Sequence, residues 1–166
     1  MTETKYLDPS TFGFFLVAVV TLPLALAQLL EKGGPTANFF MVIGLLIFFV
    51  AVWAWKCGAN FGFTVFGLVG AAVFLTGYGM GYWENISFAV VFAFAAVWTI
   101  LIGAGKNLTL IAVVTALLFL FVGLSNGDLI GGDYWRWLIG LDSFVLFALA
   151  FYMACSCAVP EKFKPF

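Results

Sequence analysis

The chain has 166 residues, of which 64% are hydrophobic and 9% charged, with a net charge of −1 and no histidine. A soluble domain carries about 25% charged residues, so this composition excludes an ordinary soluble fold and indicates an all-α integral membrane protein. The near-zero net charge offers no basic surface for nucleic acid. The lipid bilayer is therefore the first expected partner, and nucleic acid is not expected to be one.

Six apolar segments follow one another along the chain, each about as long as a bilayer-spanning helix of roughly 20 residues. Polar or turn-forming residues separate them. The predicted spans are 12–30, 37–55, 61–78, 86–103, 107–124 and 134–157. Because the connections are short, consecutive helices should pack antiparallel in one compact bundle. The whole chain, 1–166, is then a single transmembrane domain.

The third predicted span contains Gly62, Gly67 and Gly70 among Phe, Val and Leu residues. Small residues on one face let neighbouring membrane helices approach closely. We therefore expect this helix to lie at the centre of the bundle, with the other spans packed around it.

Basic residues are unevenly distributed between the two ends of the predicted bundle. If both termini are cytoplasmic, the basic residues on the cytoplasmic side are Lys5, Lys56, Lys106, Lys162 and Lys164. The external side then holds only Lys32 and Arg136. The positive-inside rule favours this orientation, in a multi-pass protein of the plasma membrane. The acidic residues on the external side are Glu31, Glu84, Asp128 and Asp133.

The residue types that catalysis or metal binding needs are sparse. The three cysteines, Cys57, Cys155 and Cys157, lie near predicted helix ends, and the chain has no histidine to complete a metal site with them. Small apolar filler is a better interpretation of these cysteines than a soft-metal site. We expect no enzyme activity, no metal and no cofactor.

Few polar residues fall within the predicted spans. Threonine hydroxyls often bond back to their own helix, so each threonine alone favours a structural role. Asp142 differs, because an ionisable residue inside a span tends to face a cavity or a partner. Two interpretations of Asp142 stay open: a hydrated carboxylate near the outer interface, or a pore-lining, protonatable group.

Two stretches resemble the acetate/succinate channel family, also called the acetate uptake transporter family. The segment Asp8-Pro-Ser-Thr-Phe-Gly-Phe14 is similar to the family signature Asn-Pro-Ala-Pro-Leu-Gly-Leu. The segment from Lys56 to Phe66 resembles Lys-x-Gly-Asn-Thr-Phe-Gly-Leu-Thr-Ala-Phe. The residues assigned to these two motifs are Asp8, Pro9, Gly13, Lys56, Asn60, Phe61 and Gly62.

The resemblance implies a homo-oligomer, a hexameric ring in which each six-helix subunit has its own pore. It places the apolar narrowing of that pore at Val17, Val69 and Leu118. Relatives have a Phe and a Tyr at the first two positions, so a wider gate is expected here. The polar residues expected to line the pore are Thr21, Thr64, Thr115 and Asp142.

The expected solute follows from the cost of desolvation. A bare carboxylate entering an apolar constriction loses far more hydration free energy than a neutral acid does. We therefore expect passage of a small organic acid, a monocarboxylate such as acetate, as the neutral acid or together with a proton. Two alternatives remain: a channel for urea, a short amide or another small neutral solute, which an acidic outer mouth would suit, and a non-transport accessory subunit of a membrane complex.

Overall fold

The structure is a computed structural model that describes residues 8–127, 133–164 and 166. Within these residues it contains six α-helices: α1 (Ser10–Leu29), α2 (Ala37–Lys56), α3 (Asn60–Tyr78), α4 (Tyr82–Leu101), α5 (Lys106–Asn126) and α6 (Tyr134–Ala158). Each is long and apolar enough to cross a bilayer. The predicted all-α membrane fold is confirmed. Lys5 and Asp128, which entered the orientation prediction, lie outside the described residues.

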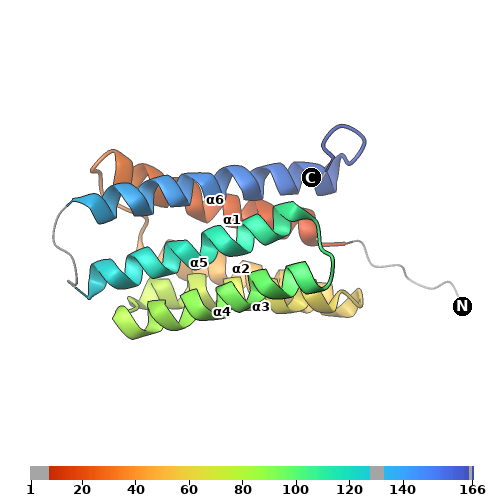
Figure 1. Cartoon of the computed structure of the whole chain (residues 1–166), viewed down its shortest axis with the longest axis horizontal. Coiled ribbons are helices and arrows are strands. Elements are labelled where there is room, and N and C mark those ends of the chain that lie inside the picture. Colours follow the sequence, from red (N-terminus) through yellow and green to blue (C-terminus); the bar gives the residue numbers. More distant parts are fainter. Residues whose placement is uncertain (1–7, 128–132, 165) are drawn as a thin grey trace, which may run out of the picture.

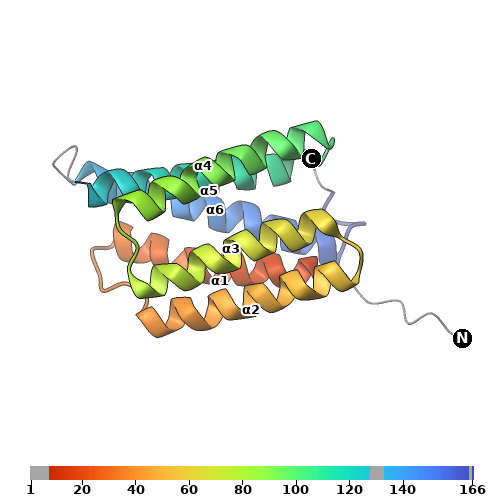
Figure 2. The same cartoon turned by 90° about the horizontal axis from the view of Figure 1, so that it is seen from below.

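The helices run roughly along one common axis, and α1 begins at the end of the bundle where α6 finishes (Figure 1). The most extensive contacts join α2 to α3, α1 to α6 and α4 to α5. Figure 2 shows α2 and α3 on one side of the bundle and α4 and α5 on the other. Which end faces the cytoplasm stays a prediction from the lysine distribution.

Glycines allow α2 and α3 to approach closely. A Cβ atom built on Gly44 would lie 2.5 Å from the backbone nitrogen of Phe74, and one built on Gly70 would lie 2.9 Å from the backbone nitrogen of Phe48. Either distance is shorter than a real side chain tolerates, so both positions require glycine. This is the small-residue packing that membrane helices use in place of a hydrophobic driving force.

The prediction that the third span lies at the centre of the bundle is wrong. Of the six helices, α3 is the least buried, and its extensive contacts are with α2. The reason is that the glycine face of α3 packs closely against a single neighbouring helix, α2. A Cβ atom on Gly67 would come no closer than 3.9 Å to another side chain.

The fourth helix begins at Tyr82, earlier than the predicted residue 86. Gly79 ends α3 with a φ of +83°, a left-handed conformation that glycine adopts without strain. The side-chain amide of Asn85 then donates to the carbonyl oxygens of Met80 and Gly81, at 3.2 and 2.7 Å. Asn85 therefore lies in the first turn of α4 rather than in a loop.

Candidate functional site

A cavity of about 460 Å³ lies within the bundle, between helices that are far apart in the sequence. It meets solvent near exposed residues at the end of α3, the end of α5 and the start of α6, among them Gly79, Asn126 and Asp133. Its walls come from all six helices, and most of the lining side chains are apolar. This composition is typical of a small-molecule site, in which a few polar groups orient the ligand.

The inner end of the cavity is lined by the three residues that the family resemblance assigned to a narrowing. Val17, Val69 and Leu118 come from α1, α3 and α5, and Leu146 of α6 joins them. Val17 and Leu118 are each 6% exposed. A solute that enters from the mouth therefore meets mostly apolar side chains at this level, with Phe92 and the hydroxyl group of Thr115 also in the lining.

Beyond this level the bundle is closed by buried residues. Phe14 precedes Val17 by three residues and Phe66 precedes Val69 by three, so each lies on the cavity-facing side of its helix, one turn deeper. Their rings pack edge to face with centroids 5.2 Å apart, and Phe66 is 2% exposed. The cavity is thus open at one end of the bundle and does not continue past Phe14 and Phe66 towards the other end.

Gly13 makes room for the seal. A Cβ atom on this residue would lie 2.5 Å from the ring of Phe66 and 2.9 Å from a methyl group of Val50. Gly13 belongs to the N-terminal stretch that resembles the channel family. Its role in this structure is steric: it lets Phe66 of α3 pack directly against the backbone of α1.

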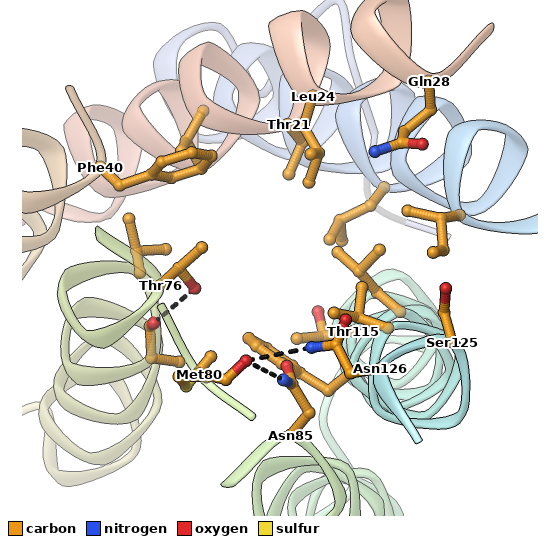
Figure 3. A pocket seen from close by; sticks show the side chains of 18 of the residues that line it. Thr21, Leu24, Gln28, Phe40, Thr76, Met80, Asn85, Thr115, Ser125 and Asn126 are labelled. Atoms are coloured by element: carbon orange, nitrogen blue, oxygen red, sulfur yellow. Dashed lines mark hydrogen bonds between the residues drawn. The ribbon is translucent and has the colours of Figure 1, made fainter. Parts of the chain in front are cut away.

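Three threonines contribute hydroxyl groups to the wall: Thr21 of α1, Thr76 of α3 and Thr115 of α5 (Figure 3). Each donates its hydroxyl hydrogen to a carbonyl oxygen of its own helix, at 2.9 Å for Thr21, 2.9 Å for Thr76 and 2.7 Å for Thr115. Their oxygens keep free lone pairs. Within the cavity these groups act as hydrogen-bond acceptors.

Two asparagines line the wall nearer the mouth (Figure 3). Asn85 is 1% exposed, and its amide nitrogen is held by the carbonyls of Met80 and Gly81. Asn126 of α5 also donates to the carbonyl of Met80, at 3.0 Å. The α3–α4 connection is thereby tied to both α4 and α5, which fixes the positions of the two side-chain amides.

An ion pair lies at the mouth. The guanidinium of Arg136, which lines the cavity, is 2.6 Å from the carboxylate of Glu31 in the α1–α2 connection. The hydrogen bond and the positive charge of Arg136 hold the pKa of Glu31 below its usual value. Gln28, at the end of α1, also points its amide towards the open space (Figure 3). The mouth is thus more polar than the interior.

Other predicted site residues lie away from the cavity. Thr64 is in the first turns of α3, where its hydroxyl donates to the carbonyl of Asn60 at 3.1 Å, and it is not among the lining residues. Asp142 of α6 is half-buried and is also not among them. Thr64 lies beyond the inner end of the cavity, since it precedes Phe66 on α3. Asp142 is at the depth of the cavity, and helix packing turns its side chain out of the lining, because helix rotation is set by neighbouring helices rather than by local sequence.

The second family-like stretch lies at the sealed end, apart from the cavity. Lys56 ends α2 and Asn60 begins α3. The ring of Phe61 packs against Trp98 of α4, with centroids 5.3 Å apart. A Cβ atom on Gly62 would lie 3.3 Å from that of Ala54. In this conformation these residues shape the packing of α2, α3 and α4 rather than the cavity wall.

Several polar lining residues were not predicted from the sequence, among them Gln28, Thr76, Asn85 and Asn126. Asn85 and Asn126 were assigned to connections between spans, because a polar residue beside glycines looks like part of a loop. Gly79 and Gly81, close before Asn85, were the available signal. A glycine-rich turn exposes carbonyl groups, and a following asparagine is well suited to bond them.

Comparison with known proteins supplies one informative match. No family model and no curated protein sequence matches the chain. Among solved structures, the chain is similar to the bacterial acetate channel SatP, with a TM-score of 0.78, 16% sequence identity and coverage of 96% of each chain. The chain shares the fold of an acetate channel. The resemblance seen in two short motifs therefore extends, at the level of the fold, to almost the whole chain.

Proposed function

We propose that this protein is a plasma-membrane channel of the acetate uptake transporter family, passing a small monocarboxylate of about the size of acetate. The observation that carries the proposal is the cavity within the bundle, which has an apolar lining, a polar mouth and an inner end at Val17, Val69 and Leu118. The fold shared with an acetate channel supports it. A cavity of this size does not suit a bundle that serves only as a scaffold.

The solute would cross as the neutral acid, or as the anion accompanied by a proton. At the level of Val17, Val69 and Leu118, the lining offers a carboxylate no charge and no hydrogen-bond donor. Burying an unpaired carboxylate there would cost several kcal/mol at least. The neutral acid loses only a few hydrogen bonds to water, so it passes at a much lower cost.

Assembly into a ring of identical subunits is part of the proposal. The least buried helix, α3, exposes Phe63, Leu75 and Tyr78. An apolar face of this kind suits lipid or a neighbouring subunit equally well in chemical terms. A hexamer is the assembly that the family resemblance favours. Cross-linking in native membranes tests this element separately from transport.

Uptake of labelled acetate into proteoliposomes tests the function. Undissociated acetic acid also crosses a plain bilayer, so protein-free vesicles set the baseline. We expect protein-dependent uptake that increases as the external pH falls. Urea and glycerol are measured in the same vesicles. Protein-dependent flux of urea without flux of acetate would replace the proposal with a neutral-solute channel, and no protein-dependent flux of any solute would overturn it.

A further inference from the structure

The three threonine hydroxyl groups of the cavity wall share one property, which is that each already donates its hydrogen to the backbone. The hydroxyl hydrogens of Thr21, Thr76 and Thr115 are donated to backbone carbonyls at 2.7 to 2.9 Å. A hydroxyl has one hydrogen to donate and two lone pairs that accept. A solute in the cavity therefore meets lone pairs at all three positions.

The side-chain amide of Asn85 likewise already donates its hydrogens to the backbone. Its amide group has two hydrogens, and both are used, at 3.2 Å to Met80 and 2.7 Å to Gly81. The side chain is 1% exposed and lines the cavity. No hydrogen bond to its carbonyl oxygen is present in the part of the chain that the structure describes. Because the residue lines the cavity, its carbonyl oxygen is free to accept a hydrogen bond from a ligand or a water molecule.

We propose that the carbonyl oxygen of Asn85, with the hydroxyl oxygen of Thr76 at the same end of the cavity, forms an acceptor site for the O–H group of an undissociated monocarboxylic acid. The proposal rests on the proposed function and states which protonation form the site binds. The neutral acid has a hydrogen to donate to these oxygens. The carboxylate has none, and its negative oxygens would face lone pairs that repel them.

The opposite wall complements this site. Gln28 reaches into the open space from α1, across from Asn85 (Figure 3). Its amide nitrogen is a donor suited to the carbonyl oxygen of the acid. A carboxylic acid has one hydrogen to donate to the oxygen of Asn85 and one carbonyl oxygen that can accept from an amide such as that of Gln28, whereas a carboxylate can only accept.

The charged groups near the site are few and lie at the mouth. Asp133 and Arg136, at the start of α6, line the cavity, and Arg136 is paired with Glu31. Glu84 adjoins Asn85 in α4 and is exposed. Titration of any of these groups could also make binding depend on pH. The test must therefore separate titration of the ligand from titration of the protein.

Acetamide provides that separation, because it has the size and shape of acetic acid, donates through N–H and does not ionise in the relevant range. Binding of acetate and of acetamide to the purified protein is measured by ligand-observed NMR over a pH series. For the wild-type protein, the dissociation constant expressed in total acetate should increase about tenfold per pH unit above the pKa of the acid. The constant for acetamide should stay flat. A constant for total acetate that is flat or falls with increasing pH would overturn the proposal.

Matched variants test the residues. Thr76→Val keeps the shape of the side chain and removes the lone pairs, and it should weaken acetamide binding by about two- to tenfold. Thr64→Val removes a hydroxyl that makes the same type of backbone bond outside the cavity, and it should change nothing. Asn85→Ala should cause a larger loss. If that variant does not fold, Thr76→Val decides, and equal binding by the two valine variants would refute the site.

The two proposals fail in different ways. Acid-selective binding without protein-dependent flux would overturn the channel function and leave the acceptor site standing. Flux of acetate with binding that shows no preference for the neutral acid would leave the channel function standing and remove the site.

Discussion

The ring of Phe66 packs edge to face against the ring of Phe14, with centroids 5.2 Å apart, directly beyond the inner end of the cavity. Both side chains are buried, at 2% and 5% exposed. They lie one helical turn deeper than Val69 and Val17 on the same helix faces. Under the proposed function, these two rings are the barrier that we expect a solute to meet after Val69 and Val17.

Replacing Phe66 with Ala should remove the barrier. Acetate uptake into proteoliposomes should increase, and larger acids should begin to pass. Loss of the buried ring should also lower the free energy of unfolding by about 3–5 kcal/mol, measured as a fall in Tm. Phe63→Ala is the matched control, because Phe63 lies on the same helix and is 42% exposed. Unchanged flux in a folded Phe66→Ala protein would place the barrier elsewhere.

Filling the cavity from α1 should have the opposite effect. Val17→Phe adds a ring at the inner end, where Val69 and Leu118 leave little spare room, so acetate uptake should fall towards the level of protein-free vesicles. Val19→Phe is the control, since Val19 is 48% exposed on the outer face of the same helix. If both variants transport equally, solute does not pass the level of Val17.

Much of this architecture could be predicted because it depends on local sequence. An apolar segment of roughly 20 residues has few alternatives to a membrane helix, so all six spans were located. Val17, Val69 and Leu118 were placed together through the family resemblance, and the structure brings all three to the cavity. Their role as a narrowing remains part of the proposed function.

The remaining features depend on how the helices are rotated and packed. Thr64 lies deeper than the closed inner end of the cavity. Asp142 has the chemistry of a pore residue, but packing against neighbours decides which face of a helix meets a cavity. The central position expected for α3 failed for the same reason: its glycines show that one neighbour comes close, not that several surround it. Asn85 was missed because its side chain determines where α4 begins.

Asp142→Asn should leave transport unchanged over the full pH range. The residue is half-buried on α6 but is not among the cavity-lining residues, and Asn preserves its shape. Acetate uptake measured at several external pH values checks this. A flattened pH profile would instead support the interpretation of Asp142 as a protonatable transport residue.

Gly44→Ala should disrupt the contact between α2 and α3. The added methyl group would lie 2.5 Å from the backbone nitrogen of Phe74, and overpacking against backbone costs about 1–3 kcal/mol. A lower Tm in detergent is the expected result. The control is Gly67→Ala on α3, where the nearest atom would be 3.9 Å away, and its Tm should stay equal or increase. Equal losses in both variants would mean that the close contact between α2 and α3 does not set the effect, because helix propensity favours alanine over glycine at both positions.

The ion pair between Glu31 and Arg136 should make a small, pH-dependent contribution to stability. Arg136 lowers the pKa of Glu31 in the folded protein, so the contribution is fully present above the unfolded pKa of about 4.3 and is lost as the pH falls through the lowered folded value. The Tm of the wild-type protein should therefore exceed that of Glu31→Gln at pH 7, and the difference should vanish in strong acid. Because the pair is exposed, high salt should also reduce the difference.

The control is Glu161→Gln, because Glu161 is an exposed glutamate without an ion pair in the described residues. This variant should match the wild type at every pH. A difference for Glu31→Gln that persists in acid would mean that the substitution acts through the conformation of the α1–α2 connection, where Glu31 has a φ of +56°, rather than through its charge.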